Sequence, residues 1–332
     1  MSAGPGIRVV AVDAASYRPH PLHATERTWT ETNCYVDLWI ELLHSLGLNP
    51  LAAAAFTIST DFEGDQWTFF KFPPEDLRAL FGLQVAEMNV WRPVLDHAEE
   101  QLELGRLVIM DADAWFLPDT QGVSYGIAHT KTAVVLNGID RAGRHLGYFH
   151  NAGYFELGGD DFDGLFRLGP YADPIALPPY VETVRLDRMR RDPNGLVAGA
   201  VALTRAHVAR RPVDDPMIRF EQRLERDAAW LASQDLETFH LYAFGTCRQC
   251  GAAAELAASF VDWLDQHDPA ASGSGDLAAA AEGFRMVATT AKALQFSLAR
   301  RSRGRTVDLH SSFEEMGRSY RTAMDGLAAR YG

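Results

Sequence analysis

The spacing of apolar residues predicts different structures in the two halves of the chain. Up to about Pro178 the sequence is rich in glycine, aromatic residues and short apolar or alternating runs, which are typical of strands. Beyond Asp215 it is rich in Ala, Leu, Glu and Arg at helical spacing. Proline-containing segments at 169–174 and 177–179 lie between the halves and disfavour helix. We therefore expect two domains, residues 1–180 and 181–332.

The first half is expected to hold helices and strands in alternation. Apolar residues three and four apart predict a helix from Val36 to Leu46 that ends at Gly47, with its N-cap at Thr28, Thr32 or Asn33. A second helix is expected over 93–104. Strands are expected over 67–72, 107–110, 132–136 and 146–150, and a turn at 140–143 predicts that the last two form a hairpin.

The second half predicts helices near 196–210, 215–233, 236–267, 276–302 and 311–330. Short connections between such helices favour an antiparallel bundle. The expected fold class is thus α+β, with a central helix and an antiparallel sheet, followed by an α-helical bundle.

Composition narrows the classes of partner. Thirty-one basic against 44 acidic residues give a net charge of −13, which opposes binding to phosphate backbones. No run approaches the roughly 18 consecutive apolar residues of a membrane span, and the first residues lack the pattern of a signal peptide. We expect a cytoplasmic protein with neither nucleic acid nor membrane as a partner.

Three cysteines, Cys34, Cys247 and Cys250, are too few for a disulfide scaffold and fit a reducing compartment. The Cys247–Cys250 pair has the spacing of metal ligands, but it lies in a helical run without a second pair, so helix packing is favoured over a metal site. The acidic residues at 61–65 lack the twelve-residue pattern of a calcium loop and are interpreted as a turn. We expect no bound metal or cofactor.

Three residues together suggest thiol catalysis: Cys34 near the start of a helix, His129 opening a strand, and Asn151 ending the next strand. A helix N-terminus and a nearby imidazole both favour a thiolate nucleophile. The hairpin would bring His129 and Asn151 together, so that the amide oxygen orients the imidazole. Each residue also has an ordinary alternative, as a buried thiol, a strand-end histidine or a turn asparagine. His150 is a rival to Asn151, but it should point to the opposite strand face.

The order of these residues resembles the papain-like superfamily, and is closest to double-glycine leader peptidases and to the N-terminal domain of butirosin-type acyltransferases. The resemblance covers roughly residues 25–170 and implies a papain-like core. The matching segments are Asn33-Cys34, Gly105-Arg106-Leu107-Val108-Ile109, Asp113-Ala114-Trp115-Phe116-Leu117-Pro118, His129, Val134-Val135-Leu136-Asn137-Gly138-Ile139-Asp140 and Phe149-His150-Asn151.

The whole chain also resembles the bacterial domain-of-unknown-function family 1839. Genes of that family often accompany a small carrier protein and a ligase that loads it with amino acids. The two resemblances imply an enzyme that moves an acyl or aminoacyl group from a carrier-protein thioester to an amine, with nucleophile Cys34, base His129 and orienting Asn151. The phosphopantetheine would be presented by the carrier.

One position departs from the papain-like pattern: Thr28 stands where these peptidases usually have an oxyanion-binding Gln. Because a thioester has a good leaving group, transfer depends less on that donor than proteolysis does, and we expect a transferase. The alternatives are a peptidase or amidase with the same triad, or a non-catalytic module that binds a carrier protein. Candidate substrate contacts are Thr28, Gln66, Trp67 and Asp113, and the Arg-rich segments 188–191 and 300–305 are either solvated faces or docking surfaces for an acidic carrier.

Overall fold

The computed structural model describes residues 6–270 and 275–332, which divide into two compact units. The first unit comprises the residues up to Ala24, Asn33–Pro50 and Pro74–Arg191. The second comprises Thr25–Thr32, Leu51–Pro73 and Asp192–Gly332. The chain therefore passes from one unit to the other several times. Among the described residues, no helix is long and apolar enough to span a membrane.

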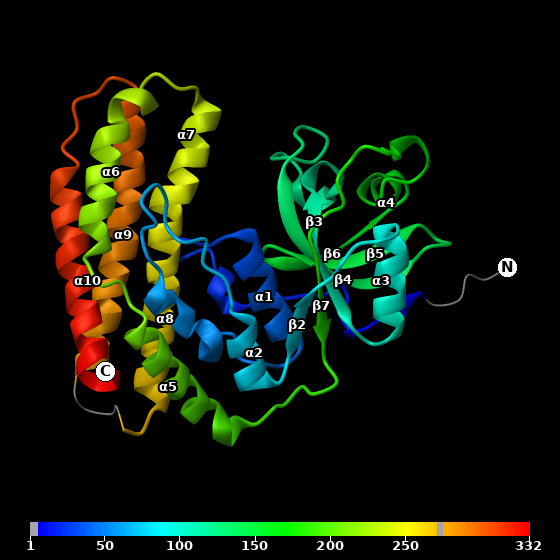
Figure 1. The fold of residues 1–332 in the computed structure, drawn as a ribbon, viewed down its shortest axis with the longest axis horizontal. Coiled ribbons are helices and arrows are strands. Elements are labelled where there is room, and N and C mark those ends of the chain that lie inside the picture. Colours follow the sequence, from blue (N-terminus) through cyan, green and yellow to red (C-terminus); the bar gives the residue numbers. More distant parts are fainter. Residues whose placement is uncertain (1–5, 271–274) are drawn as a thin grey trace. The chain divides into compact units, whose positions relative to one another are not determined.

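The first unit is built on an open antiparallel sheet of seven strands (Figure 1). Its strands follow the order β2-β7-β3-β4-β5-β6, and the short β1 pairs with β4. Their bounds are β1 Ile7–Arg8, β2 Gln84–Glu87, β3 Leu107–Asp113, β4 Lys131–Asp140, β5 His145–His150, β6 Gly153–Gly158 and β7 Val181–Arg185. The predicted hairpin is present, since Asp140 at the end of β4 pairs with His145 at the start of β5.

Helices cover both faces of this sheet. Helices α3 (Val94–Glu103) and α4 (Asp160–Leu165) lie on one face, and α1 (Cys34–Ser45) lies on the other (Figure 1). Alternate residues of the strands supply each side, because successive side chains of a strand point to opposite faces. On the face toward α3 and α4, for example, Met110 and Tyr148 are buried in one apolar cluster with Leu95 and Phe162. The unit also contains α2 (Pro74–Phe81).

Helix α1 forms where the apolar spacing predicts it. The side-chain oxygen of Asn33 accepts a hydrogen bond from the backbone N–H of Val36 at 3.0 Å, so Asn33 is the N-cap. Cys34 is then the first residue of the helix. Leu38, Trp39 and most other residues of α1 are buried, which shows that packing on the sheet stabilises the helix.

The second unit is helical throughout most of its length. It contains α5 Pro193–Ala209, α6 Pro216–Leu231, α7 Leu236–Ala243, α8 Gln249–His267, α9 Asp276–Ser302 and α10 His310–Tyr331, with a 3₁₀ segment at Leu51–Ser59. Helices α8 and α9 run antiparallel, since Asp262 late in α8 pairs with Arg285 early in α9. The long helix predicted over 236–267 is interrupted by a π-helical segment at Phe244–Arg248.

The strand predicted over 67–72 is wrong. Trp67 makes an isolated bridge to Phe62, and the residues that follow it form no ladder. The aromatic rings are used for packing instead: Phe62 and Trp67 contact Phe220 of α6. A run of aromatic residues indicates burial, but it forms a strand only where another strand lies beside it.

The first domain was expected to end at residue 180, which lies immediately before β7 of the sheet. Strand β7 pairs with both β2 and β3, so Val181–Arg185 belongs to the first unit. The α+β class and the helical C-terminal region are confirmed. The papain-like core remains a prediction.

Candidate functional site

His129 is paired with Asp113 at one end of the sheet. Its ring nitrogen Nδ1 lies 2.6 Å from Oδ2 of Asp113, the last residue of β3. The other carboxylate oxygen of Asp113 accepts the backbone N–H of Trp115 at 3.0 Å, which fixes the carboxylate. A carboxylate on Nδ1 holds an imidazole in one orientation and directs its Nε2 outward.

The ring of His129 is also stacked. It lies parallel to the indole of Trp115, with ring centroids 4.5 Å apart and an interplanar angle of 11°. The imidazole is two-thirds exposed, at 68% of its side-chain area, and its Nε2 has no hydrogen-bond partner among the described residues. It is therefore a histidine with one nitrogen held and one available, as a general base requires.

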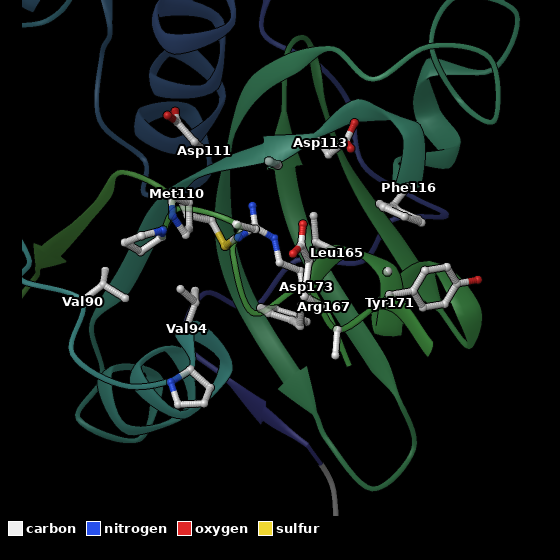
Figure 2. A pocket seen from close by; sticks show the side chains of 18 of the residues that line it. Val90, Val94, Met110, Asp111, Asp113, Phe116, Leu165, Arg167, Tyr171 and Asp173 are labelled. Atoms are coloured by element: carbon white, nitrogen blue, oxygen red, sulfur yellow. The ribbon is translucent and has the colours of Figure 1, made fainter. Parts of the chain in front are cut away.

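A cavity of about 900 Å³ opens beside this pair (Figure 2). Its walls come from β3, from the segment that precedes α3, and from residues 164–179 that follow from α4. Most of the wall is apolar, including Val90, Val94, Met110, Phe116 and Leu165. Cavities of this size and lining are typical of small-molecule sites.

The Cys34 thiol lies at the start of α1 and is partly exposed. Two contacts give the direction of α1 on the sheet. Near its first turn, the Tyr35 hydroxyl donates to Glu182 at the start of β7, and beyond its last turn the carbonyl of Leu46 accepts from Arg191, which follows β7. Because β7 runs antiparallel to β3, its start lies beside the end of β3. Cys34 is thus at the end of the sheet where β3 ends and β4 begins, although it does not line the cavity.

Asn151 occupies the turn between β5 and β6. Its φ is +43°, a left-handed conformation that asparagine tolerates better than most residues, and His150 pairs with Gly153 across the two-residue loop. Asn151 makes no hydrogen bond with His129 within the described ranges. The expected pairing of Asn151 with His129 is therefore absent, because the Asp113 carboxylate takes that place. Asn151 has the position of the ordinary alternative given above, an asparagine in a turn.

Three other candidate substrate contacts belong to the second unit and do not line the cavity. The backbone N–H of Thr28 donates to Glu255 of α8 at 2.9 Å. Trp67 is 3% exposed and packs against Phe220, as a core residue does. Gln66 is exposed beside the π-helical segment at Gly245.

Cys247 and Cys250 are both buried in the helical unit. Burial raises the pKa of the Cys247 thiol to about 12, and it raises that of Cys250 as well. Such thiols remain protonated and pack as small apolar groups. In the described parts of the chain, no group of three or more His, Cys, Asp or Glu is arranged to hold a metal ion.

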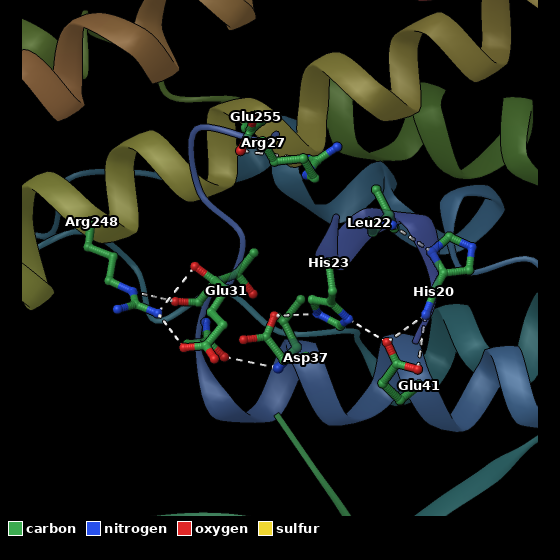
Figure 3. A network of polar contacts seen from close by, with 12 residues as sticks. His20, Leu22, His23, Arg27, Glu31, Asp37, Glu41, Arg248 and Glu255 are labelled. Atoms are coloured by element: carbon green, nitrogen blue, oxygen red, sulfur yellow. Dashed lines mark hydrogen bonds and ion pairs between the residues drawn. The ribbon is translucent and has the colours of Figure 1, made fainter. Parts of the chain in front are cut away.

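A buried polar cluster on α1 was not predicted from the sequence (Figure 3). The imidazole of His23 lies between two carboxylates, with Nδ1 on Glu41 and Nε2 3.2 Å from Asp37. Tyr17 donates its hydroxyl to Glu41 at 2.6 Å, and the backbone N–H of His20 donates to the same carboxylate. Asp37 and Glu41 are one helical turn apart, which is the sequence signal that could have shown a shared partner.

A second buried cluster holds the loop that leads into His129. Asp119 in that loop accepts hydrogen bonds from the Tyr148 hydroxyl at 2.5 Å and from His150 Nδ1 at 2.6 Å. The other ring nitrogen of His150 lies 2.8 Å from the Thr132 hydroxyl. His150 therefore anchors this loop to the sheet through Asp119.

The two Arg-rich segments differ in their contacts. In the first, Arg190 and Arg191 donate to the backbone carbonyls of Ala79 and Leu46, so they serve the packing of the first unit. In the second, Arg300, Arg301, Arg303 and Arg305 form no ion pair within residues 6–270 and 275–332.

Comparison with known families adds one finding. Residues 18–186 match the DUF1839 N-terminal domain, and residues 194–329 match the DUF1839 C-terminal domain. The chain therefore belongs to the DUF1839 family, a family defined by sequence and not by an activity. The boundary between the two matches lies close to the last residue of the first unit, Arg191. No match to a curated protein sequence was found.

Proposed function

We propose that the protein is a cysteine-dependent acyltransferase, with Cys34 as nucleophile and His129 as general base. The observation that carries the proposal is the His129–Asp113 pair, which holds one imidazole nitrogen and leaves the other without a partner among the described residues. The position of Cys34 at the same end of the sheet supports the pairing of thiol and imidazole. A histidine with a fixed tautomer next to a helix-terminal thiol is the arrangement that thiol catalysis requires.

The proposed reaction has two halves. In the first, His129 Nε2 takes the Cys34 proton as the sulfur attacks the carbonyl carbon of a thioester, and the proton then passes to the departing thiol. In the second, an amine attacks the acyl group on Cys34, loses its proton to His129, and leaves as an amide while the proton returns to the cysteine sulfur. Acyl transfer of this kind is balanced without an oxidant or reductant.

Asp113 replaces Asn151 as the orienting group in this proposal. Its carboxylate holds Nδ1 and is itself held by the N–H of Trp115. A carboxylate in this position stabilises the imidazolium that forms during each half-reaction. The stacked indole of Trp115 restricts the ring further.

The acyl donor is proposed to be a thioester presented on the phosphopantetheine of a carrier protein, and the acceptor a small-molecule or peptide amine. The resemblance of the residue order to papain-like acyltransferases supports this choice of donor and acceptor. The unpaired arginines of segment 300–305 would suit an acidic carrier.

The test is the mass of the intact protein after incubation with an octanoyl thioester of N-acetylcysteamine. We expect one added octanoyl group on Cys34, and its transfer to glycine amide when that amine is added. Cys34→Ser should form no adduct. His129→Ala and Asp113→Asn should slow acylation by about 10²–10⁴-fold, the usual contribution of a general base, whereas His145→Ala, an exposed histidine on β5, should not.

Three other outcomes of this experiment would contradict the proposal or favour a different function. Acylation that persists in Cys34→Ser contradicts the covalent mechanism. An adduct that releases only free acid in the presence of amines favours a hydrolase. Retention of an acylated carrier protein without any adduct favours a binding module.

A further inference from the structure

Arg167 lines this cavity, and its side chain is exposed (Figure 2). The residue follows α4 and has a φ of +55°, so its backbone is in the left-handed region. Its N–H donates to the carbonyl of Gly164, which closes the end of the helix. The side chain donates through Nη1 to the carbonyl of Leu177 at 2.7 Å. Arg167 is thus held at the cavity by both its backbone and its side chain.

The guanidinium of Arg167 has no carboxylate partner within the parts of the chain that the structure describes. Arg92, which also lines the cavity, pairs with Glu100. A guanidinium carries five N–H donors in a planar fork. Only one bond is given to Leu177, so several donors remain for a ligand.

Two of the three carboxylates that line the same cavity lie against a basic side chain. Asp113 holds His129, and Asp111 pairs with Lys131 at 3.0 Å. Asp173 accepts the backbone N–H of Ile175 at 3.0 Å. On this wall Asp173 has no ion-pair partner among the described residues, and Arg167 is the guanidinium without a carboxylate partner.

We infer that this cavity binds a small molecule with an apolar body and one anionic head group, and that Arg167 binds the head group. Carboxylates and phosphates match the guanidinium fork, and the bonds formed are charge-assisted. The apolar body would lie against side chains such as Val94, Met110 and Leu165. The inference goes beyond the proposed function, because the cavity lies on the side of the sheet that α3 and α4 cover, whereas α1 and Cys34 lie on the other face. Binding of the ligand does not require Cys34.

The test measures binding to the full-length Cys34→Ser protein by isothermal titration with octanoate, octyl phosphate and octylamine. We expect both anions to bind and octylamine to bind at least ten times more weakly. The order of affinity of octyl phosphate and octanoate shows which of these two head groups the site prefers.

Substitution of Arg167 is expected to remove this preference. Arg167→Gln should weaken the anions about ten- to one-hundred-fold, which is the size of a charge-assisted hydrogen bond, and leave octylamine unchanged. Arg167→Asn provides a second variant, since asparagine tolerates the left-handed backbone at this position. The matched control is Arg106→Gln, whose guanidinium bonds Gln101 away from the cavity.

Equal binding of all three probes, or anion binding that survives both Arg167 variants, would overturn the inference. Absence of binding by every probe would overturn it as well. Failure of the proposed function is a separate result: anions that bind through Arg167 to a protein whose Cys34 is never acylated leave the binding site intact and remove the thiol mechanism.

Discussion

His23 is a buried histidine whose charge is set by its neighbours. Burial alone would lower its pKa, but the hydrogen bonds and charges of Asp37 and Glu41 outweigh that effect and raise the pKa from 6.5 to about 9. The same contacts lower the pKa of Glu41, against the effect of its own burial. At neutral pH the imidazole is therefore protonated and joins the N-terminal segment to α1.

The free energy of unfolding should depend on pH through this group. Because the folded pKa lies above the unfolded one, the stabilisation is complete below about pH 6.5 and is lost as the pH rises to about 9. A shift of this size corresponds to a loss on the order of 3 kcal/mol. Urea unfolding at pH 6.5 and pH 9 should show this loss in the wild type.

His23→Gln should be less stable at pH 6.5 and should show a smaller change between the two pH values. The exposed His145→Gln serves as the matched control and should follow the wild type. Equal pH dependence of stability in the wild type and His23→Gln would contradict the assignment of this dependence to His23.

At the scale of elements, α9 and α10 approach each other closely through glycine. A Cβ at Gly283 of α9 would lie 2.6 Å from the carbonyl oxygen of Ser319 and 3.2 Å from the Cβ of Ala323, both in α10. At Gly317, by contrast, the nearest atom is the end of the flexible Arg321 side chain, at 3.2 Å. Gly283 thus lies at the close approach of the two helices, whereas none of the three atoms nearest to a Cβ on Gly317 belongs to α9.

Gly283→Ala is expected to destabilise the helical unit by about 1–2 kcal/mol, since the cost of overpacking exceeds the roughly 1 kcal/mol gained in helix propensity. Gly317→Ala should be neutral or stabilising, because Arg321 can move. Thermal unfolding of the two variants measures the difference. A Gly283→Ala protein as stable as Gly317→Ala would show that the helices can separate at no cost.

At the scale of the whole molecule, the two units share one interwoven chain. Residues 51–73 lie between α1 and α2 in the sequence, yet they belong to the helical unit. Their buried residues pack there: Phe62 and Trp67 contact Phe220 of α6, and the 3₁₀ segment at Leu51–Ser59 packs against α5 and α8. The family boundary near residue 190 is therefore not a boundary between independent folding units.

A fragment of residues 1–191 should aggregate when expressed alone, because the apolar side chains of 51–73 lose the helices that bury them. Co-expression with residues 192–332 should restore a soluble complex, detectable by size-exclusion chromatography. A monomeric 1–191 fragment with a cooperative unfolding transition would contradict this view of the fold.

The local spacing of residues predicted much of this molecule. Helix α1 with Cys34 near its start, the β4–β5 hairpin and the helices of the second half all follow from periodicities that span a few residues. The rest depends on contacts between distant residues. The run at 67–72 has the composition of a strand, but no partner strand lies beside it.

The candidate site likewise depends in part on local sequence and in part on contacts between distant residues. The sequence by itself determined that Cys34 begins an amphipathic helix and that His129 precedes a strand. Tertiary structure alone decided that Asp113 holds His129, that His23 lies between Asp37 and Glu41, and that Arg167 lines the cavity. The physical reason is that periodicity encodes which face of an element is buried, whereas the partner of a polar side chain depends on how the elements pack together.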